Sequence, residues 1–142
     1  MRATKIAVAL GGVLLVAAVV VTTNRVADDG AGHSGGAGAV LISAQEAAQI
    51  IETDPQVFVV NVHVPYAGEI EGTDAFVPYD EVADRIDEFP ADRSTPVLLY
   101  CRSGRMSADA AHPLLEAGYT HVLDVDGGMV EWESAGLPVV TQ

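Results

Sequence analysis

The sequence contains a single cysteine, Cys101, among its 142 residues. One cysteine cannot form an internal disulfide, so this thiol is buried and inert, paired with another chain, or reactive. Cations are also scarce, with 7 Lys and Arg against 20 Asp and Glu and a net charge of −13. Because nucleic-acid phosphates repel such a chain, we expect no nucleic-acid partner. The four histidines do not cluster, so the sequence predicts no metal site, and we expect no cofactor.

Polar residues are absent from residues 6–21, which follow the basic Arg2 and Lys5. A basic start and an apolar centre are typical of an export signal. A helix through residue 23 is about 27 Å long, close to the ~30 Å of a bilayer core. We therefore predict that residues 1–25 are a signal peptide or a membrane anchor. The uncleaved anchor is favoured because no clear cleavage site follows the apolar run.

Residues 26–39 are rich in glycine and predict a flexible linker. The domain is then residues 40–142, expected on the extracytoplasmic side and either membrane-anchored or secreted, because Arg2 and Lys5 stay inside. The sequence leaves the oligomeric state open.

Short apolar segments alternate with amphipathic segments along this domain. The predicted strands are residues 39–42, 57–62, 97–100 and 121–125, and the predicted helices are residues 43–52, 79–89, 107 onward and 129–134. Residues 63–78, with several prolines and glycines, predict a long loop with little regular structure. Strands that alternate with helices indicate an α/β fold with a central parallel sheet flanked by helices.

Cys101 lies between the predicted strand at 97–100 and a helix that we expect to begin with Ser107 as its N-cap. Free N–H groups and the dipole at a helix start favour a thiolate over a thiol. Arg102 and Arg105 are close enough in sequence to face the same anion. An inert cysteine suits the middle of an apolar strand better than a loop with glycine and arginine. We therefore interpret Cys101 as reactive.

The run Cys101-Arg102-Ser103-Gly104-Arg105-Met106-Ser107 resembles the active loop of rhodanese-like domains. The closing stretch, with Asp126-Gly127-Gly128, Trp132 and Gly136-Leu137-Pro138, is similar to the end of the same family, and the resemblance covers about residues 40–140. The resemblance implies a central parallel sheet and a thiosulfate sulfurtransferase-like activity. Such an enzyme moves a sulfane sulfur from a donor such as thiosulfate to a nucleophilic acceptor, through a persulfide on the loop cysteine.

On this resemblance Cys101 is the nucleophile, and the rest of the loop binds the donor and the persulfide. The binding residues are Arg102, Ser103, Gly104, Arg105, Met106 and Ser107. The two arginines suit the sulfonate end of a small anionic donor. Gly104 permits the tight turn, and the Ser107 hydroxyl donates to the sulfur. The expected partners are therefore a small anionic sulfur donor and a thiophilic acceptor.

The chain departs from the family's common pattern in three places. Met106 stands where many members have arginine, and Asn61-Val62-His63 replaces an Asp-x-Arg pattern. The Gly-His-Ile-x-Gly-Ala stretch that normally follows is absent. These departures bear on the donor and on efficiency more than on the fold.

Two other functions remain open at this stage. The first is a non-catalytic rhodanese-like module that binds a partner or senses oxidants at the membrane surface. The second is a phosphatase, which is disfavoured because it needs a longer loop closed by arginine, whereas position 107 is serine.

Overall fold

The structure, a computed structural model, describes residues 38–141. The predicted signal peptide or anchor at 1–25, and all of the predicted linker except its last two residues, lie outside this range. None of the helices within residues 38–141 has both the length and the apolar character that a membrane span needs.

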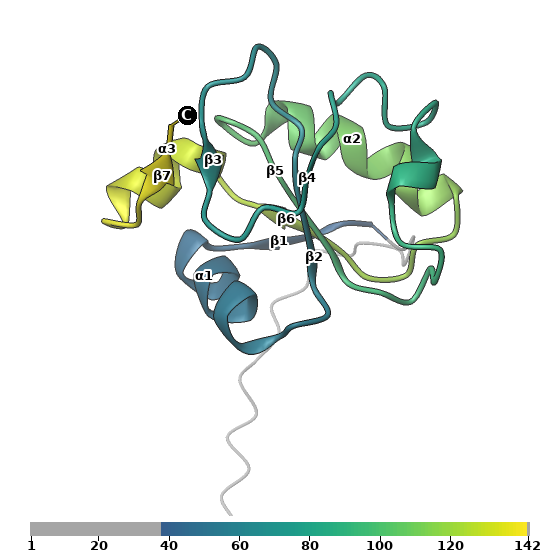
Figure 1. Cartoon of the computed structure of the whole chain (residues 1–142), viewed down its shortest axis with the longest axis horizontal. Helices are drawn as coiled ribbons and strands as arrows, with labels where there is room; N and C mark the ends of the chain where they lie inside the picture. Colours follow the sequence, from purple (N-terminus) through teal and green to yellow (C-terminus); the bar gives the residue numbers. More distant parts are fainter. Residues whose placement is uncertain (1–37, 142) are drawn as a thin grey trace, which may run out of the picture. The chain divides into compact units, whose positions relative to one another are not determined.

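A five-stranded parallel sheet forms the centre of the domain (Figure 1). In spatial order its strands are β1 (Val40–Ile42), β6 (Val122–Val125), β5 (Val97–Tyr100), β2 (Phe58–Asn61) and β4 (Ala75–Phe76). Each neighbouring pair is parallel, which confirms the predicted α/β fold. The middle strand, β5, is buried at all four of its residues, as expected for a strand covered on both faces. A separate antiparallel pair joins β3 (Glu69–Ile70) to β7 (Val139–Val140).

Three α-helices flank the sheet. They are α1 (Ala44–Thr53), α2 (Arg105–Glu116) and α3 (Gly128–Ser134). Helix α1 begins with a capping box, as predicted. The Ser43 hydroxyl accepts the Glu46 N–H at 3.2 Å, and the Glu46 carboxylate accepts the Ser43 N–H at 2.9 Å. Figure 1 shows α1 and α2 on opposite sides of the sheet.

The core has two halves, one on each face of the sheet. Because successive residues of a strand point to opposite faces, β5 contributes to both. Val97 and Leu99 pack with residues of α2, whereas Leu98 and Tyr100 pack with residues of α1 and α3. The end of β5 is therefore held firmly between two packed layers.

Residues 79–89 do not form the predicted helix. They form turns and a short 3-10 helix, η1 (Ile86–Glu88). The apolar pattern still marks the inward side, because Val82 and Phe89 are buried. Pro78 and Pro90 bound the segment. Packing of its apolar side chains, rather than helix propensity, therefore sets its backbone.

The segment at 63–78 is more regular than predicted, since it contains β3 and β4. Tyr100 ties this segment to β5. Its buried hydroxyl accepts the Ile70 N–H at 3.0 Å and lies 2.7 Å from the Thr73 hydroxyl oxygen. Burial raises the pKa of Tyr100 to about 12, so the phenol stays neutral. The sequence did not predict β3 and β4, because a strand of two residues is too short to show an alternation of apolar and polar residues.

Candidate functional site

Cys101 directly follows β5 and is only 1% exposed. Its sulfur accepts the Gly104 N–H at an N···S distance of 3.0 Å. The Ser107 hydroxyl oxygen lies 3.5 Å from the sulfur as a second donor, and 3.1 Å from the Gly104 carbonyl oxygen. The structure therefore brings three of the predicted site residues together around one sulfur atom.

Helix α2 begins at Arg105 rather than after Ser107, so Ser107 is not its N-cap. Gly104 is the N-cap, with a φ of +95° that glycine adopts without strain. Ser107 instead lies buried in the first turn, where its hydroxyl reaches the sulfur. The first N–H groups of a helix have no intrahelical acceptor, so those of Arg105 and Met106 are available to an anion at the loop.

The remaining loop residues are more peripheral. Arg102, Ser103 and Arg105 are exposed, and Met106 is half-buried against the core on the α2 side of the sheet. Within residues 38–141, neither loop arginine forms an ion pair, although Arg85 elsewhere pairs with two acids. Both loop arginines are therefore open to solvent.

The loop docks on the start of α3 through main-chain hydrogen bonds. The Cys101 carbonyl accepts the Met129 N–H at 2.9 Å, and the Arg102 carbonyl accepts the Val130 N–H at 3.0 Å. Gly128 sits at the contact with a φ of +57°, and a Cβ there would lie 2.3 Å from the Cys101 carbonyl oxygen. The loop can approach α3 this closely because position 128 carries no side chain.

The end of β2 lies beside the loop, since Asn61 pairs with Tyr100 in the sheet register. The Asn61 amide nitrogen donates to the Gly68 carbonyl at 3.0 Å, and its oxygen accepts the His63 N–H at 3.0 Å. Burial, and then the positive charge of Arg102, lower the pKa of His63 and so favour its neutral imidazole. Among the described residues, nothing hydrogen-bonds its buried Nδ1. His63 is therefore a neighbour of the loop, and not only the end of a strand.

Asp124 on β6 is a residue that the sequence analysis did not single out. It is 2% exposed, and its Oδ1 has no hydrogen-bond partner within the described part of the chain. Burial raises the pKa of Asp124 to about 6, the nearby Ser107 hydroxyl partly offsets this, and the charge of Asp126 adds to it. The sequence signal that could have identified Asp124 is its position as a lone acid inside an apolar strand, just before Asp126-Gly127-Gly128.

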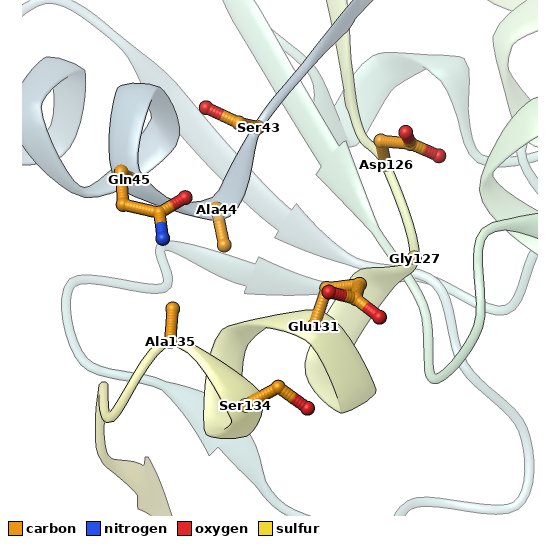
Figure 2. Close-up of a pocket in the computed structure, with 8 residues that line it drawn as sticks. All are labelled: Ser43, Ala44, Gln45, Asp126, Gly127, Glu131, Ser134 and Ala135. Atoms are coloured by element: carbon orange, nitrogen blue, oxygen red, sulfur yellow. The ribbon is translucent and has the colours of Figure 1, made fainter.

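A polar hollow of about 370 Å³ lies between the start of α1 and α3 (Figure 2). Its wall includes Asp126, Gly127 and Glu131, close to where the loop docks. Because it carries two acids and no basic residue, this hollow repels anions.

These features define a class, an α/β domain that presents one thiol at the N-terminal end of a helix packed on a parallel sheet. A family model described as "Rhodanese-like domain" matches residues 39–135. The chain therefore belongs to the rhodanese-like domain family.

Known relatives agree with this assignment over part of their length. A sulfurtransferase of Allochromatium vinosum is 41% identical over 64 residues, covering 45% of this chain and 58% of that protein. The thiosulfate sulfurtransferase PspE of Escherichia coli is 41% identical over 51 residues. This match covers 36% of this chain and 49% of PspE. The matched region thus spans about half the length of these relatives.

A solved structure gives the same fold. The crystal structure of a rhodanese-related protein from Thermoplasma volcanium is 25% identical, with a TM-score of 0.62. The match covers 72% of this chain and 99% of that one.

The close approach at Gly128 predicts the effect of an added methyl group. Gly128→Ala should lower the free energy of unfolding by about 3 kcal/mol or more, from left-handed strain plus the collision with the Cys101 carbonyl. Gly118→Ala is the matched control, because Gly118 has a φ of +92° but nothing within 4 Å of a Cβ. It should lose only about 1 kcal/mol. Urea unfolding measures both, and equal losses would contradict the role assigned to the contact.

Asp124 predicts a pH-dependent cost in stability. Because its folded pKa lies above the ordinary 3.8, the folded chain holds more protons than the unfolded chain between pH 3.8 and about 6. The free energy of unfolding therefore falls as pH rises through this window, by up to about 3 kcal/mol. Asp124→Asn removes this cost, so the variant should be more stable than wild type at pH 7.5 and similar to it at pH 4.

Urea midpoints at the two pH values measure the difference. Asp84→Asn, which removes an exposed acid, is the matched control and should show no such pH-dependent gain. A stability advantage of Asp124→Asn that does not grow with pH would contradict the prediction.

Proposed function

We propose that this protein is a sulfurtransferase that carries a sulfane sulfur as a persulfide on Cys101. Its donor is a small anion such as thiosulfate, and its acceptor is a thiophilic nucleophile. The observation that carries the proposal is the pair of donors on the Cys101 sulfur, the Gly104 N–H at 3.0 Å and the Ser107 hydroxyl at 3.5 Å. Both donors favour a negatively charged sulfur, which is the reactive form.

In the first half-reaction, the Cys101 thiolate attacks the outer sulfur of thiosulfate. A new S–S bond forms to Cys101, the S–S bond of thiosulfate breaks, and sulfite leaves with the bonding electron pair. In the second half-reaction, a nucleophile such as cyanide attacks the outer sulfur of the persulfide. The Cys101 thiolate leaves with its electron pair, and thiocyanate forms when cyanide is the acceptor. The cycle needs no external oxidant or reductant.

The loop stabilises negative charge on the sulfur, both in the Cys101 thiolate and in the persulfide. The first N–H groups of α2 have no intrahelical acceptor, and the helix dipole adds partial positive charge at this end of the helix. Arg102 and Arg105 supply exposed positive charge in a chain with a net charge of −13. We propose that these two guanidinium groups hold the sulfonate oxygens of the donor.

The relatives support the same reaction class. Two of the proteins that this chain resembles carry the names sulfurtransferase and thiosulfate sulfurtransferase. Because the aligned regions cover only about half of those proteins, the use of thiosulfate by this chain rests on the proposal and its test.

Mass spectrometry of the intact full-length chain tests the persulfide directly. After thiosulfate treatment, the wild type should gain the mass of one sulfur atom, and cyanide should remove it. Because Cys101 is the only cysteine, Cys101→Ser should gain nothing. No gain by a wild-type chain whose thiol still reacts with iodoacetamide would contradict the proposal and turn attention to the non-catalytic binding or sensing module.

The arginines predict a change in donor affinity. Arg102→Gln and Arg105→Gln should each raise the KM for thiosulfate about tenfold, the value of one charge-assisted hydrogen bond, and change kcat by less than about threefold. Steady-state thiocyanate formation measures both constants. Arg85→Gln is the matched control, because Arg85 pairs with Glu81 and Glu88 away from the loop. A KM that stays unchanged in both loop variants would contradict the assigned role.

A further inference from the structure

The Ser107 hydroxyl is shared between two acceptors, although it has only one proton to donate. Its oxygen lies 3.5 Å from the Cys101 sulfur and 3.1 Å from the Gly104 carbonyl oxygen. Asp124 faces the same end of α2, because it lines one cavity together with Ala108, the residue that follows Ser107. An acceptor that takes the hydrogen bond of the Ser107 hydroxyl therefore weakens the hydrogen bond from Ser107 to the Cys101 sulfur.

Asp124 is unusual among the acids of this chain because it is almost completely buried. It is 2% exposed, its Oδ1 has no hydrogen-bond partner within residues 38–141, and no cation is paired with it there. The strand register places it between Leu41 of β1 and Leu99 of β5. A buried carboxyl among apolar neighbours is costly in free energy when it is ionised.

A cavity of about 430 Å³ gives Asp124 a route for proton exchange. The cavity lies between β1 and α2, and Leu41, His112 and Asp124 are part of its wall. Leu41 is 64% exposed and His112 is also exposed, so water can reach the cavity from that side. Asp124 can therefore gain or lose a proton without any opening of the loop around Cys101.

We propose that Asp124 is a positioning residue for the sulfur site, which acts through the Ser107 hydroxyl and whose charge decides how strongly that hydroxyl holds the Cys101 sulfur. An ionised Asp124 attracts the Ser107 proton away from the sulfur and repels a negative sulfur. A neutral Asp124 carries its own O–H, which donates to Ser107 and leaves the Ser107 proton to the sulfur. The inference rests on the proposed function only in taking Cys101 as the reacting group.

Other charged groups around Asp124 modulate this effect. Asp126, which is exposed, opposes ionisation of Asp124, and burial favours its neutral form. His112 on α2 lines the same cavity and would favour ionisation when protonated. The neighbouring positions on β1 and β5 are apolar, and Cys101 is the remaining titratable group at the Ser107 hydroxyl.

The test follows the alkylation rate of Cys101 in the full-length chain against pH, with iodoacetamide as the probe. Only the thiolate reacts, and there is no second cysteine, so the midpoint of the rate profile reports the ionisation of Cys101 alone. Asp124→Asn should move this midpoint to lower pH by about one unit, because the Ser107 hydroxyl is no longer drawn to a carboxylate and donates to the negatively charged sulfur. Ser107→Ala should move it to higher pH.

The double variant, Asp124→Asn with Ser107→Ala, separates the route from a direct charge effect. If Asp124 acts through Ser107, Asp124→Asn should change the thiolate population less than about threefold once the hydroxyl is absent, against about tenfold when it is present. An equal effect in both backgrounds, or a midpoint that Asp124→Asn does not move, would overturn the inference. Asp84→Asn removes an exposed acid and should leave the midpoint unchanged.

A milder variant gives the same answer if Asp124→Asn folds poorly. Asp126→Asn should let Asp124 ionise at lower pH, so the midpoint of the Cys101 rate profile should move to higher pH. A profile identical to wild type would contradict the inference. Neither measurement depends on thiosulfate, so a chain that fails to form the persulfide would refute the proposed function without affecting this test.

Discussion

The structure depends on the close contact between the cysteine loop and the start of α3. The Cys101 carbonyl accepts the Met129 N–H at 2.9 Å, and the absence of a side chain at Gly128 makes this approach possible. The contact fixes the backbone where β5 ends, so the chain must turn at once into α2. Gly104 makes that turn with a left-handed backbone, and the Gly104 N–H then points at the sulfur. One main-chain contact thus positions the thiol, the turn and the helix start.

Near this contact, the strands carry buried polar side chains, most of which have hydrogen-bond partners while one does not. Asn61 is fully satisfied by the Gly68 carbonyl and the His63 N–H, and the Tyr100 hydroxyl by Ile70 and Thr73. Such satisfied groups hold the segment at 63–78 against the sheet. Asp124 on β6 is the contrast, since its Oδ1 has no partner among residues 38–141. A buried carboxyl that lacks a hydrogen-bond partner is sensitive to the charges around it, because the protein interior screens charge weakly.

Much of the fold was predictable because it follows from local patterns. The capping box at Ser43, the apolar run at 97–100 and the alternation of strands with helices each have one preferred backbone. Residues 79–89 were not predictable in this way, since burial of Val82 and Phe89 is compatible with both a helix and a series of turns. The N-cap of α2 was misplaced by three residues, because Ser107 resembles an N-cap, whereas its hydroxyl donates to the Cys101 sulfur. Of the site, the loop was predictable from its motif, but Asp124 lies on a strand that looked like ordinary core.

The sequence by itself determined the class of the domain, the location of its one thiol and the excess of negative charge, because composition and short motifs carry that information. It also determined that a glycine pair follows β6, although not what the glycines are for. Only the tertiary structure decided that Gly128 admits the Cys101 carbonyl and that Asp124 is buried between β1 and β5. Both features join segments that are distant in sequence. They arise because the parallel sheet places the ends of β2, β5 and β6 at one edge, which no local pattern encodes.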